Sequence, residues 1–330
     1  MAPSKTLLPQ GHVAFIGAGP GDPELLTIRA LRLIEAAEVI LHDQLVPAEI
    51  LALAAPEAEL VSVGKKGFGP SVRQEEINTR LIEFARAGAR VVRLKAGDPG
   101  VFGRLDEETE ALEAAGVPHF VTPGLTAATA AAAGMGVSMT RRGRNSDLRL
   151  LTGHDVRGFA EQDWRSLARP GAVAAIYMGK RAARFLQGRL MMHGADLATP
   201  VTVVENVSRA DERRLPATLA TLAADLDAAE LDGPAVLLLG LAPRDAAAVC
   251  MLSGADTAMN WYLIRQGDLK LIQWGTGAEV PPQLFNITAD PLETTDLARV
   301  RPGDVARLDA ERREAISAVE ELKATRNAAS

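Results

Sequence analysis

Short apolar runs alternate with longer amphipathic stretches along most of the chain. The first five runs predict buried strands, at Val13–Ile16, Val39–Leu41, Leu60–Val63, Val91–Leu94 and Phe120–Val121. Stretches with helical spacing separate them, at Glu24–Ala36, Gln74–Ala87 and Glu107–Ala115. Strands that alternate with helices in this way are typical of a mostly parallel sheet.

A second series of the same kind begins near Thr126. Its strand candidates are Leu148–Leu151, Val173–Tyr177, Val201–Glu205 and Ala235–Leu239, again with helices expected between them. Pro123 and Gly124 stand between the two series, and both residue types interrupt regular structure. The pattern therefore predicts an α/β fold with two lobes, residues 1–124 and 125–248.

The pattern changes after the second lobe. Tyr262–Ile264 and Leu269–Ile272 flank a Gln-Gly-Asp turn, which predicts a β-hairpin, and Leu284–Ile287 is a further strand candidate. Arg307–Arg326 has the composition of a charged helix with one apolar stripe. Residues 249–330 are therefore expected to form a small α+β appendage.

Composition narrows the class of protein. The 330 residues carry a formal net charge of −6, which argues against a broad nucleic-acid-binding face. The start lacks a signal-peptide core, and no run of about 18 apolar residues follows, so no membrane partner is expected. The single cysteine, Cys250, excludes an intramolecular disulfide and a cysteine-rich metal site. A cytoplasmic protein without a bound metal is the prediction.

The turn after the first predicted strand, GAGPGD at residues 17–22, is open enough for a ligand to approach the backbone. Asp22 stands where the dinucleotide fingerprint needs its third glycine, and its carboxylate would repel a pyrophosphate. The turn therefore suits S-adenosylmethionine, which has an adenosine but no phosphate, better than NAD. A plain turn with Asp22 as helix cap is the alternative.

Charged residues follow the other strands of the first lobe. Asp43 suits a ribose ligand, an acid or base, or a helix cap. Lys65 lies in a glycine-flanked loop, where it could bind a carboxylate of an anionic substrate or be a solvated surface side chain. The segment Arg93–Arg104 gathers Arg93, Lys95, Asp98 and Arg104 at a strand end where α/β folds bind ligands.

A basic cluster lies in the second predicted lobe. The arginines at positions 141, 142, 144 and 149 suit a polyanionic substrate or surface ion pairs.

Ten ordered motifs between about residues 11 and 244 resemble the tetrapyrrole methylase family, and within it the uroporphyrinogen-III C-methyltransferases. They are GAGPGDPELLT, HDQLV, VGKK, QEEIN, RLKAGDPGVFGR, PGLTAATAAAA, TGHD, IYMGK, TPVTVVEN and GPAVLLLG. The resemblance implies a two-lobed homodimeric enzyme with S-adenosylmethionine between the lobes. Such enzymes methylate uroporphyrinogen III at C2 and C7 to precorrin-2, on the way to sirohaem and cobalamin.

The resemblance also implies roles for single residues. Asp43 matches the family's proton acceptor and Lys65 its proton donor. Cofactor contacts are expected at Pro20, Ala96, Gly97, Asp98, Val101, Thr126, Ala127, Met178, Val207 and Ala235. Gln44 and Gly100 depart from the family's usual Arg and Phe, which leaves the particular tetrapyrrole open.

Three other functions stay open at this point. They are methylation of a later precorrin, a nicotinamide-dependent oxidoreductase and a noncatalytic tetrapyrrole-binding protein. Residues 259–298 resemble the C-terminal hairpin of sulfatases, but the chain has no C/S-x-P-x-R motif in a suitable context, so sulfatase activity is not expected.

Overall fold

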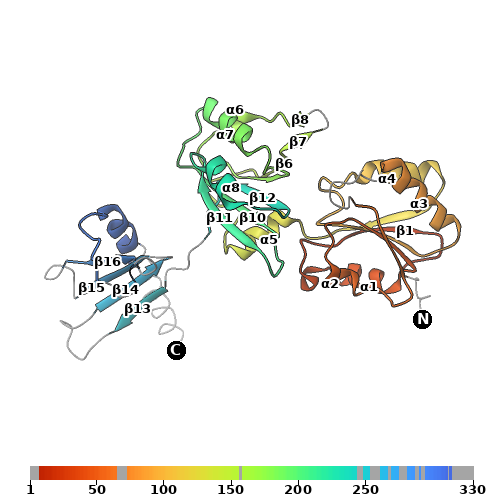
Figure 1. Ribbon diagram of the computed structural model, residues 1–330, viewed down its shortest axis with the longest axis horizontal. Coiled ribbons are helices and arrows are strands. Elements are labelled where there is room, and N and C mark those ends of the chain that lie inside the picture. The colour runs from red at the N-terminus through yellow and green to blue at the C-terminus, as the bar shows by residue number, and fades with distance from the viewer. Residues whose placement is uncertain are drawn as a thin grey trace. The chain divides into compact units, whose positions relative to one another are not determined.

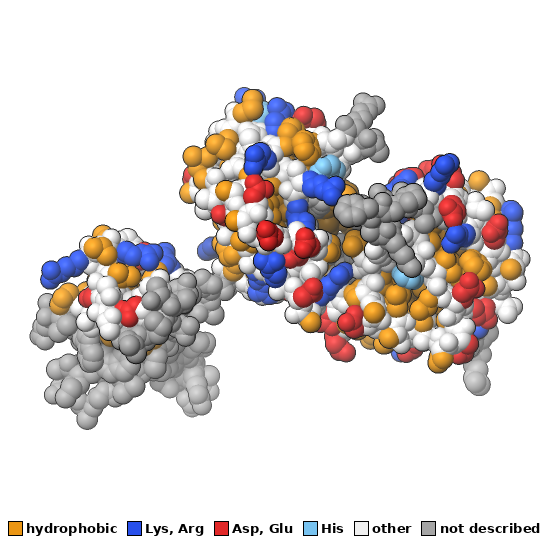
Figure 2. All heavy atoms as spheres, in the orientation of Figure 1, with side chains coloured by type: hydrophobic (Ala, Val, Ile, Leu, Met, Phe, Trp, Pro, Cys, Tyr) orange, Lys and Arg blue, Asp and Glu red, His pale blue; other side chains and the backbone are white. Residues whose placement is uncertain are grey.

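The computed structural model describes residues 7–64, 73–155, 158–243, 248–252, 261–266, 269–274, 281–286, 290, 294–310 and 312–313. The chain divides into two compact units, Met1–Pro243 and Arg244–Ser330. On the face of the first unit that Figure 2 shows, basic and acidic side chains lie interspersed.

The first lobe is built on a five-stranded parallel sheet of order β3-β2-β4-β1-β5. Its strands are β1 (Val13–Gly17), β2 (Val39–His42), β3 (Glu59–Ser62), β4 (Val91–Lys95) and β5 (His119–Thr122). Helices α1 (Ile28–Ala36) and α2 (Ala48–Leu51) cover one face, and α3 (Gln74–Arg86) and α4 (Leu105–Ala114) cover the other (Figure 1). Because both faces are buried, β1 and β2 are mostly apolar runs, as the sequence predicted, whereas the middle strand β4 also buries Arg93 and Lys95.

The helix expected at Glu24–Ala36 is divided in two. A 3₁₀ turn, η1 (Pro23–Leu25), comes first, and Asp22 caps it by accepting from the Glu24 amide at 2.9 Å. The α-helix then begins at Ile28, where the Thr27 hydroxyl accepts from the Ala30 amide. Two successive caps explain the division, because each cap residue has an extended backbone.

The second lobe carries a mixed sheet of order β11-β10-β12-β9-β6, in which only β6 and β9 pair in parallel. Its strands are β6 (Arg149–Thr152), β9 (Ala174–Tyr177), β10 (Pro200–Glu205), β11 (Arg213–Thr218) and β12 (Ala235–Leu239). Helix α5 (Ala127–Gly134) packs on one face; α6 (Trp164–Leu167), α7 (Ala183–Met192) and α8 (Leu222–Ala229) pack on the other. A short hairpin, β7 (His154–Asp155) and β8 (Gly158–Phe159), follows β6.

The second unit contains a four-stranded antiparallel sheet. Its strands are β13 (Ala248–Leu252), β14 (Trp261–Gln266), β15 (Leu269–Trp274) and β16 (Gln283–Asn286). The predicted hairpin is confirmed as the β14–β15 pair, and Leu308 of the helical residues 302–310 packs against Ile264 and Leu284. The expected helix beyond residue 313 lies outside the described residues.

In the part of the chain that the structure describes, no helix has the length and hydropathy needed to cross a bilayer. Within the same residues, no group of three His, Cys, Asp or Glu side chains is arranged to hold a metal ion.

Candidate active site

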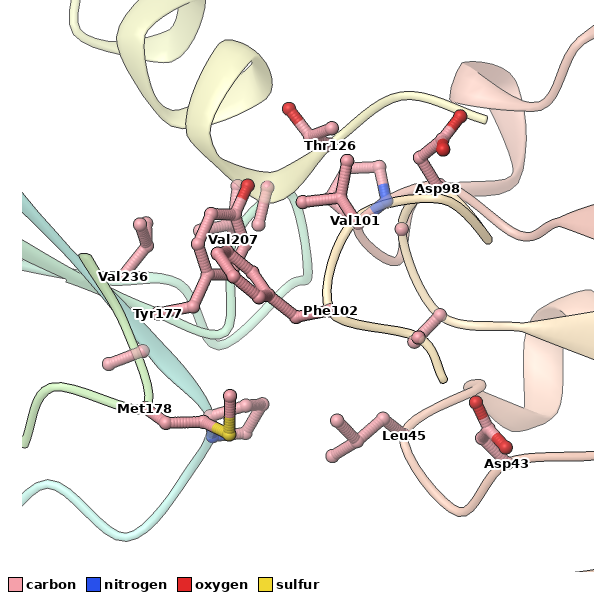
Figure 3. A pocket seen from close by; sticks show the side chains of 18 of the residues that line it. Asp43, Leu45, Asp98, Val101, Phe102, Thr126, Tyr177, Met178, Val207 and Val236 are labelled. Atoms are coloured by element: carbon pink, nitrogen blue, oxygen red, sulfur yellow. The ribbon is translucent and has the colours of Figure 1, made fainter. Parts of the chain in front are cut away.

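Both lobes of the first unit line a cavity of about 550 Å³ (Figure 3). All ten residues that the resemblance assigns to the cofactor line it, and so does Asp43. The sequence did not single out several further lining residues, which include Leu45, Phe102, Tyr177, Lys180, Arg209 and Val236. Lys65 lies outside the described residues.

Backbone forms the side of the cavity where the strands of the first sheet end. Gly19 and Gly97 exchange two backbone hydrogen bonds of 2.8 and 3.1 Å. A Cβ at Gly124 would lie 2.2 Å from the Gly97 carbonyl oxygen, so three turns meet with no room for side chains. The Asp98 carboxylate joins two of these turns by accepting from the Gly100 and Gly124 amides, at 2.8 and 3.0 Å. Asp98 thus fixes the cavity's shape from its edge.

Side chains of the second lobe form the opposite wall. The Tyr177 hydroxyl accepts from the Ala128 amide at 3.2 Å, next to the cap that Thr126 makes at the start of α5. The Tyr177 ring lies against Phe102 of the first lobe, with 5.3 Å between ring centroids. Met178 has a positive φ of 53° and leaves about half of its surface exposed at the cavity. A non-glycine residue in that conformation is uncommon and marks a constrained site.

The turn after β10 touches the first lobe at two points beside the cavity. The Asp22 amide donates to the Ser208 hydroxyl at 3.0 Å, and Arg209 Nη2 donates to the Leu45 carbonyl at 2.6 Å. Val207, which directly precedes these two residues, is buried and lines the cavity. Hydrogen bonds at the two residues after Val207 therefore join the lobes beside the cavity.

A chain of charged side chains leads from the cavity into the first lobe. Asp43 Oδ1 lies 2.5 Å from Arg93 Nη2, Arg93 contacts Glu108 at 3.2 Å, and Lys95 Nζ lies 2.9 Å from Glu108 Oε2. Burial, together with the neighbouring Arg93 charge, lowers the pKa of Lys95 from its ordinary value of 10.5, although Glu108 opposes this shift.

The charged residues that the sequence grouped at Arg93–Arg104 do not share one site. Arg93 and Lys95 point into the lobe, Asp98 orders the turns, and Arg104 pairs with Glu107 on the surface. The four arginines at positions 141, 142, 144 and 149 are absent from the cavity lining, and Arg149 forms ion pairs with Asp147 and Asp163. Surface pairing thus accounts for that arginine.

The chain is similar in sequence and in fold to known proteins. Residues 12–223 match the family model described as Tetrapyrrole (Corrin/Porphyrin) Methylases. The chain is 47% identical over 230 residues to siroheme synthase 2 of Aeromonas hydrophila. This match covers 70% of this chain and 48% of that protein. It is 43% identical over 259 residues to a uroporphyrinogen-III C-methyltransferase of Paracoccus denitrificans, over 78% of this chain and 90% of that one. The chain thus spans about half the length of the siroheme synthases it matches.

Solved structures show the same likeness. The crystal structure of uroporphyrin-III C-methyl transferase from Thermus thermophilus, complexed with S-adenyl homocysteine, is 39% identical with a TM-score of 0.60. The match covers 69% of this chain and 92% of that one. A cobalt precorrin-4 methyltransferase is 27% identical with a TM-score of 0.63, over 71% of this chain and 98% of that one.

Proposed function

The chain belongs to the tetrapyrrole (corrin/porphyrin) methylase family, and on that premise we propose that it methylates uroporphyrinogen III at C2 and C7, with S-adenosylmethionine as methyl donor. The product is precorrin-2. One observation carries the proposal: a single cavity gathers Asp43 and all ten residues that the resemblance assigns to the cofactor. The likeness to a methyltransferase structure that holds S-adenyl homocysteine supports the choice of cofactor.

The residues present fit such a cofactor. A volume of about 550 Å³ suits a ligand of its size, because small-molecule pockets range over about 300–1,000 Å³. The Gly19–Gly97 pair leaves backbone without side chains along one side, while Val101 and Val236 supply apolar surface. When bound, S-adenosylmethionine supplies a methyl group already activated by its sulfonium. The protein's own tasks are to orient the acceptor carbon, exclude water and accept a proton.

We assign the proton-accepting task to Asp43. Its side chain lines the cavity and keeps 33% of its surface exposed, so a substrate can reach it. Arg93 Nη2, 2.5 Å from Oδ1, holds the carboxylate in one orientation at the cavity. Lys65 as proton donor follows from the resemblance alone.

Assembly, location and domain limits belong to the same proposal. We propose a cytoplasmic homodimer with lobes at residues 1–124 and 125–248 and an appended segment at 249–330. The division of the chain after Pro243 supports a boundary in this region. The sulfatase-like character of the appended hairpin stays a prediction.

A later precorrin is the second candidate substrate. Gln44 and Gly100 depart from the family pattern, and the likeness to a cobalt precorrin-4 methyltransferase favours this alternative. Because each substrate gives a product of different mass, one assay separates the two.

The test is anaerobic turnover of uroporphyrinogen III with methyl-labelled S-adenosylmethionine, followed by mass spectrometry. Gain of two labelled methyl groups is the expected result. Asp43→Asn should lower kcat about 100-fold, an order typical of a lost general base, and leave the cofactor Kd nearly unchanged. The matched control is Asp147→Asn, because Asp147 is a surface carboxylate that pairs with Arg149 and does not line the cavity.

Two outcomes argue against the proposal. Wild-type protein that binds the cofactor but transfers no methyl group to uroporphyrinogen III redirects the search to later precorrins. An Asp43→Asn variant that binds the cofactor poorly, yet turns over normally at saturation, makes Asp43 a cofactor ligand and not the base.

A further inference from the structure

Four charged side chains of alternating sign form an unbroken chain behind the cavity wall: Asp43, Arg93, Glu108 and Lys95. The three inner side chains are at most 3% exposed, and only Asp43, at the cavity end, meets solvent. Their formal charges sum to zero. This chain of charges links Asp43, which follows β2, with Arg93 and Lys95 of the central strand β4 and Glu108 of helix α4.

Stability of the lobe does not explain these charges. Arg93 lies beside Phe15 of β1 and Leu41 of β2 in the sheet register, so its strand neighbours are apolar. Burial of an ion costs several kcal/mol, and apolar residues of similar size are often as stabilising as a buried ion pair or more so. This chain of charges ends at Asp43, which lines the cavity, so its role concerns the cavity and not the stability of the lobe.

Glu108 determines how Arg93 faces Asp43. Both Glu108 oxygens lie within 3.3 Å of Arg93 Nε, and Glu108 Oε1 also lies 3.2 Å from Nη2. Glu108 thus holds the Nε–Nη2 edge of the guanidinium in the orientation from which Nη2 donates to Asp43. Lys95 holds the same carboxylate from β4, and the neutral Gln74 amide of α3 holds it at 3.1 Å from the other side. A guanidinium is planar and rigid, so fixing Nε fixes the direction of Nη2.

We propose that Glu108 is a positioning residue, which orients Arg93 so that the Asp43 carboxylate is held in place at the cavity. The proposal rests on the proposed function, in which Asp43 accepts a proton. Without the Glu108 carboxylate, Arg93 Nε loses the group that fixes its direction. The guanidinium can then turn, and Asp43 loses its fixed partner.

The test compares Glu108→Gln with Glu38→Gln. The control changes another carboxylate of the first lobe, which pairs with Arg90 at 2.9 Å and does not line the cavity. Glu108→Gln is expected to lower kcat about 10- to 100-fold, as small misplacements of catalytic groups do, with the cofactor Kd unchanged. The loss should fall on kcat and leave the KM for uroporphyrinogen III unchanged, a split that a merely structural defect would not produce.

Folding and substrate identity are controlled separately. The double variant Lys95→Met/Glu108→Gln removes one charge of each sign, so the buried chain stays neutral, and its kcat should remain low. A crystal structure of Glu108→Gln should show Arg93 Nη2 beyond hydrogen-bond distance of Asp43, a readout that does not depend on the substrate. An intact Arg93–Asp43 contact there, or an unchanged kcat in an active enzyme, overturns the inference. Wild-type protein that transfers no methyl group overturns the proposed function instead.

Discussion

Each lobe of the first unit places a lysine beside a buried glutamate, but the two pairs are built differently. Lys95 and Glu108 meet at 2.9 Å, and both side chains are buried. Lys180 lies 3.7 Å from Glu205 and donates to the carbonyls of Leu231, at 2.7 Å, and Gly233. The first pair extends a chain of charges that reaches the cavity, whereas the second anchors the backbone that leads into β12.

The two lobes form their sides of the cavity from different parts of the chain. The first lobe presents glycine backbone with the carboxylates of Asp43 and Asp98, and the side chains of Arg93, Glu108 and Lys95 lie behind them. The second lobe presents the side chains of Tyr177, Met178 and Val236, and Lys180 of its ion pair lines the cavity while it holds the Leu231–Gly233 backbone (Figure 3). Variants in each wall should therefore fail in different ways.

The largest effect is expected from Gly124→Ala in the backbone wall. The new Cβ would lie 2.2 Å from the Gly97 carbonyl oxygen and 2.7 Å from Gly17 Cα, and neither backbone atom can move aside easily. We expect a loss of about 3 kcal/mol in the free energy of unfolding, measured in urea, and no cofactor binding. Gly188→Ala in α7 is the control, because its Cβ meets nothing within 4 Å. Alanine in place of glycine inside a helix should raise the free energy of unfolding by about 0.5–1 kcal/mol. Equal urea midpoints for Gly124→Ala and wild type would show that the three turns do not need their close approach.

Lys180→Met should have the next largest effect, on the opposite wall. It leaves two carbonyls without their donor and removes a cation from the buried Glu205, whose amide donor is Gly233. We expect a cost of about 2 kcal/mol in the free energy of unfolding and a weaker cofactor Kd, as the loop of Pro234 and Ala235 loosens. Arg184→Met breaks only the exposed pair with Asp227 and should change neither quantity. If the Lys180→Met loss falls on kcat alone, the comparison between the two pairs is wrong.

The sequence predicts the strands of the first lobe well for a physical reason. A parallel sheet covered on both faces requires continuous apolar runs, and such runs are visible without any structure. β11, at Arg213–Thr218, was missed because it is an edge strand with charged residues and Pro216, which has no amide to donate. Thr27 ends the preceding extended segment and starts α1, a local cap within a stretch whose periodicity suggested one helix.

The site was predictable only in part. The glycine turns and Asp43 stand out as residue types with a chemical use at strand ends. Met178 and Val207 came from the resemblance alone, because apolar side chains of this kind more often pack in cores. Glu108 gave no signal, since it stands in an acidic stretch with Asp106, Glu107 and Glu110. Only the packing of α4 against β4 separates the buried carboxylate from its exposed neighbours.

Tyr177→Phe is expected to have a smaller effect, confined to the side-chain wall. It removes the hydroxyl that accepts from the Ala128 amide and leaves the ring in place against Phe102. We expect a loss of about 1 kcal/mol in the free energy of unfolding, typical of one hydrogen bond, and a cofactor Kd raised no more than about tenfold. A variant as damaged as Lys180→Met would mean that the start of α5 depends on this single hydroxyl.

The smallest effect concerns the protonation of Lys95. Burial and the neighbouring Arg93 lower its pKa below 10.5, so the folded protein releases this proton before the unfolded chain does. Between the lowered pKa and 10.5 the unfolded chain binds more protons, and the contribution of Lys95 to the free energy of unfolding therefore rises with pH. Urea unfolding of wild type and Lys95→Met across the alkaline range should show their difference shifting in favour of wild type. A difference that stays constant would mean that Glu108 keeps Lys95 protonated across the whole alkaline range. The four charges of Asp43, Arg93, Glu108 and Lys95 would then persist as long as the lobe stays folded.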